Sequence, residues 1–155
     1  MRSTEKRCLQ SWRKELLAQA HGDLLEIGAG TGVNLPHYPD HINRIILSEP
    51  DAQMRKQLQR ETDQFQQQRL NITPWGADSI EMPDGSFDTI VSTLVLCSVP
   101  NLETSLNEIY RLLRPNGILL FLEHVISDHP ATRTWQHRIE PIWGFCAGNC
   151  HLTRD

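Results

Sequence analysis

The sequence feature that most constrains the fold is a short apolar run followed by three glycines at alternate positions. The run covers residues 23–27, and Gly28, Gly30 and Gly32 follow it. Glycine is required where the backbone adopts a positive φ or passes close to another group, because a Cβ atom would obstruct both. We therefore expect a buried strand over residues 23–27 that ends in a tight turn, and we expect a ligand to approach the backbone at this turn.

Hydrophobic patterning along the rest of the chain predicts strands that alternate with helices. Continuous apolar runs, such as residues 45–47, suit a parallel strand that is buried on both faces. The alternation predicts an α/β fold with a doubly wound, mainly parallel sheet and helices on both faces. The expected strands cover residues 23–27, 43–47, 71–75, 87–92 and 118–122, and the expected helices cover residues 4–20, 33–35, 51–61, 101–114 and 132–145, the last broken near Pro141.

Two of these helices have apolar side chains at a spacing that predicts a buried face. In the helix over residues 4–20, Leu9, Trp12, Leu16 and Ala20 recur every three or four residues, so we expect them to face the core. In the helix over residues 51–61, Met54 and Leu58 are expected to point inward.

Composition limits the classes of function. The chain has 155 residues, of which 39% are hydrophobic and 22% are charged, which fits a single globular domain over residues 1–155. A net charge of -4 argues against nucleic-acid binding. No apolar stretch approaches the ~20 residues that a membrane span needs, and residues 1–15 are too polar for a signal peptide. We therefore expect a cytoplasmic protein.

The four cysteines do not form a pattern that predicts a metal site. Cys146, Cys150 and His151 are close in sequence, but structural zinc sites use four ligands in paired short spacings and no second pair is present. Cys8 and Cys97 are isolated. We therefore expect reduced thiols and no metal.

Spacing also excludes two nucleotide-binding motifs at the glycine turn. The dinucleotide fingerprint G-x-G-x-x-G requires a third glycine for close packing of helix on strand, and Val33 occupies that position here. A phosphate-binding P-loop requires a lysine after the loop, and none is present.

The segment Glu26-x-Gly28-x-Gly30-x-Gly32 resembles motif I of the class I methyltransferases that use S-adenosylmethionine. Further matches follow in the family's order: an acidic residue, Glu49, at the end of the second strand, residues 77–79 after the third strand, and the turn at residues 112–117 before the fifth. The resemblance covers about residues 20–125 and implies a Rossmann-like, cofactor-binding core there.

The resemblance implies S-adenosylmethionine as cofactor and S-adenosylhomocysteine as its product. A carboxylate at Glu49 can accept hydrogen bonds from both ribose hydroxyls, and the family places adenine contacts where Asp78 lies. The residues expected to bind the cofactor are Glu26, Gly28, Ala29, Gly30, Gly32, Asn34, Glu49, Pro50, Met54, Ala77, Asp78, Ser79 and Leu94.

Residues 93–99, 123–125 and 150–154 are similar to the methyltransferase-like group that includes membrane-associated alkyl thiol methyltransferases. The chain departs from that group because it has no hydrophobic N-terminal anchor, has Glu49 where aspartate is more usual, and contains no recognisable strands six and seven. The similarity implies methyl transfer to a small thiol or apolar acceptor. A lipid or quinone methyltransferase, and a truncated cofactor-binding module without activity, are alternatives.

His124 is the expected catalytic residue on the acceptor side. It follows the strand over residues 118–122, and ligands of open α/β sheets bind outside the carboxyl ends of the strands.

An uncovered fifth strand would expose unpaired backbone groups. We therefore expect residues 135–150 to cap this edge, or a second copy of the chain to pair with it as a homodimer.

Overall fold

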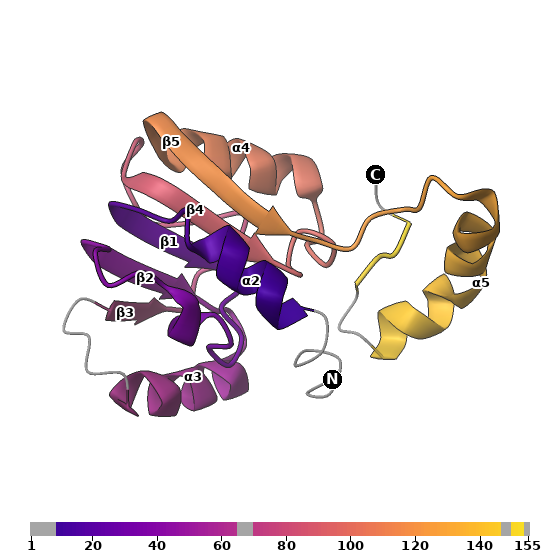
Figure 1. Ribbon diagram of the computed structural model, residues 1–155, viewed down its shortest axis with the longest axis horizontal. Coiled ribbons are helices and arrows are strands. Elements are labelled where there is room, and N and C mark those ends of the chain that lie inside the picture. Colours follow the sequence, from indigo (N-terminus) through magenta and orange to yellow (C-terminus); the bar gives the residue numbers. More distant parts are fainter. Residues whose placement is uncertain (1–8, 65–69, 147–149, 154–155) are drawn as a thin grey trace.

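The computed structural model describes residues 9–64, 70–146 and 150–153, and these form one parallel sheet with helices on both faces (Figure 1). The strand order is β3-β2-β1-β4-β5, and every neighbouring pair is parallel. This arrangement confirms the predicted α/β, Rossmann-like class. The strands are β1 (Asp23–Ile27), β2 (Arg44–Ser48), β3 (Leu70–Thr73), β4 (Phe87–Thr93) and β5 (Leu113–Leu122).

The register brings the carboxyl ends of the central strands level with one another. Ile27, the last residue of β1, is paired with Ser48 of β2 on one side and with Ser92 of β4 on the other. The loops that leave these three strands therefore begin at the same edge of the sheet. This edge is where ligands of such folds bind.

The helices cover both faces of the sheet because successive strand residues point to opposite sides. Leu24 packs with Leu17 and Leu58 on one face, whereas Leu25 packs with Ile109 on the other. Each such side chain, when fully buried, contributes about 1.5–3 kcal/mol. The helical elements are α2 (Gln10–Leu17), the 3-10 helix η2 (Leu35–His37), α3 (Ala52–Gln64), α4 (Leu102–Leu112) and α5 (Pro130–Cys146).

Two predicted inward positions are wrong. Trp12 is 57% exposed. The neighbouring Arg13 is buried instead, because its guanidinium donates hydrogen bonds to Asn34 and Thr93. Met54 is 47% exposed, whereas Leu58 is buried as expected. Met54 lies in the first turn of α3, which starts at the strand ends before the helix reaches the face of the sheet.

Two predicted boundaries are also wrong. β5 begins at Leu113, earlier than the expected start at Ile118, because Leu113 pairs with Phe87 before an irregular register shift. Asn116 has a φ of 68° within this shift, so the expected turn is absorbed into the strand as an irregularity. α5 continues through Pro141 without the expected break, at the cost of one hydrogen bond that proline cannot donate.

The free edge of β5 is not capped by the segment that the sequence suggested. α5 lies beyond the carboxyl end of β5 and not alongside its free edge (Figure 1). The capping prediction is therefore wrong, and Phe121 on β5 is 57% exposed. Pairing of this edge across two copies remains a prediction. Within the described residues, no strand follows β5, and no helix has the length and apolar character needed to cross a membrane.

Candidate functional site

The glycine turn, Gly28 to Gly32, lies at the carboxyl end of β1. All three glycines have a positive φ, of 62° at Gly28, 57° at Gly30 and 85° at Gly32. A Cβ atom on Gly28 would lie 2.6 Å from Val95 Cγ2, so close packing requires glycine there. A Cβ atom on Gly30 would meet nothing within 4 Å. Gly30 therefore faces open space, which leaves room for a ligand against the backbone.

Glu49 ties the end of β2 to this turn. Its carboxylate accepts hydrogen bonds from the Gly30 amide through Oε2 and from the Asp51 amide through Oε1, both at 2.8 Å. Glu49 is buried at 6% exposure. Each carboxylate oxygen accepts more than one hydrogen bond, so Glu49 keeps acceptor capacity for two ribose hydroxyls. The structure thus brings Glu49 and the glycine turn together as the sequence predicted.

A buried polar network supports the turn from below. Tyr38 Oη and Asn34 Nδ2 each donate a 2.7 Å hydrogen bond to the Glu26 carboxylate. Arg13 Nη1 donates to Asn34 Oδ1 and to Thr93 Oγ1, both at 2.8 Å. Burial raises the pKa of Glu26, against the opposing effects of the Tyr38 and Asn34 hydrogen bonds and of the Arg13 charge. Glu26 and Asn34 are therefore placed to hold the loop after the turn in position.

Arg13 and Thr93 were not recognised from the sequence as part of this network. Apolar periodicity assigns the charged residues of a helix to its solvent-exposed face, so it predicts an exposed Arg13. A tertiary hydrogen bond from Arg13 to a residue 80 positions away carries no local signal.

The remaining predicted cofactor residues follow the ends of the neighbouring strands. The Ala29 amide donates to the Ser48 carbonyl at 2.9 Å, and the Glu49 amide donates to the Thr73 carbonyl at 3.0 Å. Pro50 is exposed at the start of the loop into α3. Ala77 is partly buried, and Asp78 and Ser79 are exposed beyond β3. No contact brings Asp78 to the glycine turn, so its adenine role remains a prediction.

Leu94 marks the point where the chain leaves β4. Its φ is 61°, in the left-handed region that non-glycine residues seldom adopt. Its amide donates to the Leu122 carbonyl at 2.8 Å. Leu94 thus changes the direction of the chain where it leaves the carboxyl end of β4.

Glu123 fixes the loop that follows Leu94. Its Oε1 accepts from the amides of Val95 and Leu96, both at 3.0 Å, and its Oε2 accepts from the Cys97 amide at 3.2 Å. Ser92 Oγ donates to the same carboxylate at 2.7 Å. Sequence patterns place Glu123 only in a matching motif and predict no role for its side chain. The carboxylate holds the loop over residues 95–97 against the end of β5.

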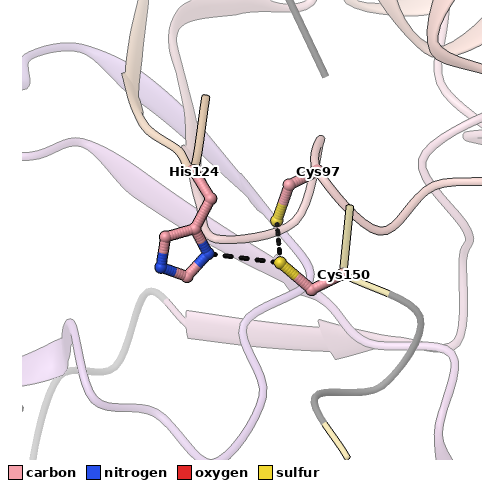
Figure 2. Close-up of side chains that lie close together, drawn as sticks. All are labelled: Cys97, His124 and Cys150. Carbon is pink, nitrogen blue, oxygen red and sulfur yellow. Dashed lines mark hydrogen bonds between the residues drawn. The ribbon is translucent and has the colours of Figure 1, made fainter. Parts of the chain in front are cut away.

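Cys97, His124 and Cys150 meet beyond the ends of β4 and β5, and we call them the Cys-His cluster (Figure 2). The Cys150 sulfur lies 3.2 Å from the Cys97 sulfur and 3.2 Å from His124 Nδ1. Both cysteines are buried, and His124 is half-buried with its ring edge-on to Trp143. Burial, with a hydrogen bond to Cys150, raises the pKa of the Cys97 thiol to about 12.

The sequence placed His124 at the strand ends, and the structure agrees. It did not predict the pairing of Cys97 with Cys150, which lie 53 positions apart. His151, which follows Cys150 in sequence, has a different partner, because its Nδ1 contacts Glu140 Oε1 at 3.1 Å. The Cys146 side chain lies outside the described part of the chain.

Comparisons with known proteins agree on one family. A family model described as a methyltransferase domain matches residues 1–154. Human thiol S-methyltransferase TMT1B is 37% identical over 96% of this chain and 65% of its own length. Human thiol S-methyltransferase TMT1A is 38% identical over 85% of this chain and 55% of its own length. The chain thus spans less than two thirds of these relatives.

A solved structure shows the same fold. The YcgJ protein from Bacillus subtilis superposes with a TM-score of 0.79 at 18% identity, and the match covers 95% of this chain and 62% of that one. At this identity the likeness concerns the fold alone.

Proposed function

The chain belongs to the methyltransferase-domain family, and we propose that it is an S-adenosylmethionine-dependent methyltransferase that acts on a small thiol or apolar acceptor. The observation that carries the proposal is the junction of the glycine turn with Glu49. A backbone that faces open space at Gly30 lies next to a buried carboxylate with spare acceptor capacity. The open backbone suits a part of the ligand that packs against it, and the carboxylate suits a ribose in the same ligand.

The residues present fit S-adenosylmethionine. The glycine turn, Ala29 and Leu94 would line the cofactor, Glu49 would accept its ribose hydroxyls, and Glu26 and Asn34 would keep the loop in place. Pro50, Met54, Ala77, Asp78 and Ser79 are proposed at the nucleoside end. When bound, the cofactor supplies a methyl group on a sulfonium sulfur, and in-line displacement by an acceptor leaves S-adenosylhomocysteine.

The acceptor is proposed to enter beside His124. Residues 94–97 leave the carboxyl end of β4, where Val95 lies against Gly28 of the glycine turn. His124 follows β5, which is the neighbour of β4 in the sheet. The work of the chain is to orient the acceptor and exclude water, which favours displacement at a methyl carbon. The names of the relatives at 37% and 38% identity support a thiol acceptor for this chain.

Two experiments test the proposal. Isothermal titration with S-adenosylmethionine and S-adenosylhomocysteine should show one site per chain. Methyl transfer from labelled cofactor should then favour small alkyl thiols over the matched alcohols and amines of the same carbon skeleton. Absence of cofactor binding would overturn the proposal, and binding without transfer to any acceptor would favour the inactive binding module. The cytoplasmic location and the homodimer remain predictions, and gel filtration checks the latter.

A further inference from the structure

The Cys-His cluster gathers three metal-binding side chains from distant parts of the chain. Cys97 follows β4, His124 follows β5, and Cys150 belongs to the segment after α5 (Figure 2). The two sulfurs and an imidazole nitrogen all lie within 4.8 Å of one another. Thiolate sulfur and imidazole nitrogen are the ligands that zinc prefers in proteins.

We propose that Cys97, His124 and Cys150 form a zinc site with three protein ligands, whose fourth position takes the sulfur of the thiol acceptor. Three protein ligands and one open position are typical of catalytic zinc. Within the described residues, no fourth histidine, cysteine or carboxylate joins the group. Tetrahedral zinc with ordinary bond lengths would separate these donor atoms by about 3.5–3.8 Å. The two observed 3.2 Å distances are slightly shorter than these values, and the third pair, Cys97 Sγ and His124 Nδ1, lies within 4.8 Å.

The surrounding contacts hold the ligands as they would in a built metal site. The His151 amide donates to the Cys97 carbonyl at 2.8 Å, which fastens the Cys150 segment to the Cys97 loop. Glu140 accepts from the Leu152 amide at 2.9 Å, and Gln136 Nε2 donates to the Leu152 carbonyl at 3.1 Å. These contacts fix the backbone of the Cys150 segment relative to the Cys97 loop. A disulfide between the two cysteines would not account for the contact of His124 Nδ1 with the Cys150 sulfur.

The position of the cluster connects it with methyl transfer, and this half of the inference rests on the proposed function. Val95 lies two residues before Cys97 and packs against Gly28 of the glycine turn. An acceptor thiol bound at the fourth position would lose its proton to solvent, because metal coordination favours the thiolate. His124 then acts as a ligand, and no protein base is needed.

The transfer step balances with this acceptor. The thiolate sulfur forms a bond to the methyl carbon as the bond between that carbon and the sulfonium sulfur breaks. The electron pair of the broken bond stays on the sulfur of S-adenosylhomocysteine. The methylated product is a neutral thioether, a weaker ligand than a thiolate, and it leaves the fourth position for water or the next thiol.

Cobalt(II) substitution tests the metal site without measuring activity. The chain is stripped with a chelator under reducing conditions and loaded with Co²⁺, and zinc content is measured on a parallel sample. We expect one metal per chain, a sulfur-to-cobalt charge-transfer band for two thiolates, and the visible bands of tetrahedral cobalt. The intensity of the charge-transfer band in the wild-type chain reports the number of thiolate ligands, so the result does not depend on whether variants fold. A chain that takes up no stoichiometric metal, or whose two thiols oxidise to a disulfide instead, overturns the inference.

Variants assign the ligands. Cys97→Ser and Cys150→Ser should each weaken metal binding at least about 100-fold, beyond the 10–100-fold effect typical of losing an outer contact. His124→Ala should weaken binding as well, because the proposal makes His124 the third ligand. Cys146→Ser and His129→Ala are the matched controls and should leave binding unchanged. Metal loss in Cys146→Ser with binding retained in Cys97→Ser would overturn the assignment.

A thiol titration tests the fourth position. A small alkyl thiol added to the cobalt-loaded chain should shift its visible bands, whereas the matched alcohol should not, and an unchanged spectrum overturns the open position. Failures of the two proposals are distinguishable. Full methyl transfer by metal-free chain would overturn the zinc inference and leave the proposed function intact. A thiol-responsive cobalt spectrum in a chain that binds no cofactor would support the zinc site and overturn the proposed function.

Discussion

Glu49→Ala is expected to weaken cofactor binding and to destabilise the glycine turn, because one carboxylate serves both. Its two oxygens hold the amides of Gly30 and Asp51 at 2.8 Å. Each hydrogen bond to a charged group is worth about 1.5–3 kcal/mol. Asp51 is exposed, so water replaces the carboxylate at its amide. We therefore expect a loss of unfolding free energy of about 1.5–3 kcal/mol, the value of the Gly30 bond alone.

The effect on S-adenosylmethionine follows from the same range. A net loss of one charged hydrogen bond to the ribose should raise the dissociation constant about 10- to 150-fold. Isothermal titration measures the affinity, and urea unfolding with and without cofactor measures the stability. Asp51→Asn is the matched control, because it removes a nearby charge while asparagine still caps α3 as well as aspartate does. Unchanged affinity in Glu49→Ala, or an equal loss in Asp51→Asn, would remove Glu49 from the cofactor site.

Three further predictions concern the turn and the network beneath it. Gly30→Ala should cost about 1–2 kcal/mol for its positive φ yet abolish cofactor binding, whereas Gly28→Ala should cost about 1–3 kcal/mol more because its Cβ overlaps Val95; equal unfolding free energies in urea would contradict this. Burial raises the pKa of Glu26, so its contribution to stability is full below the ordinary value of 4.5 and is lost as pH rises through the raised pKa. Glu26→Gln should therefore remove the fall in unfolding free energy that begins as pH rises above 4.5, and a profile parallel to that of the wild type would refute the cause. Arg13→Met leaves the buried Asn34 Oδ1 without its donor, so it should cost about 1–3 kcal/mol; an unchanged free energy of unfolding in urea would refute that role.

The sheet was predictable because its signals are local. The run before Gly28 and the run over residues 45–47 are continuous apolar segments, and both became buried parallel strands. Boundaries that depend on pairing were not predictable in the same way. The early start of β5 depends on Leu113 meeting Phe87, and no residue near Leu113 records that partner.

The same distinction between local signals and long-range contacts applies to the candidate site. Gly30 and Glu49 were found because glycine at a turn and an acid after a strand are local patterns, and the structure joined them through one hydrogen bond. Arg13 was missed because its burial depends on Asn34 and Thr93, which a helical periodicity does not register. The pairing of Cys150 with Cys97 was missed, because the two residues are far apart in sequence and no local pattern connects them.

The contact between Gly28 and Val95 has a consequence for the kinetics of the proposed reaction. Val95 is fixed by Glu123, which also holds the Cys97 amide, so the glycine turn and the acceptor loop form one packed unit. A ligand that orders the turn also orders the loop, and the coupling between two such sites is reciprocal. Cofactor and acceptor should therefore raise each other's affinity. Initial-rate measurements should show the KM for each substrate falling as the concentration of the other rises.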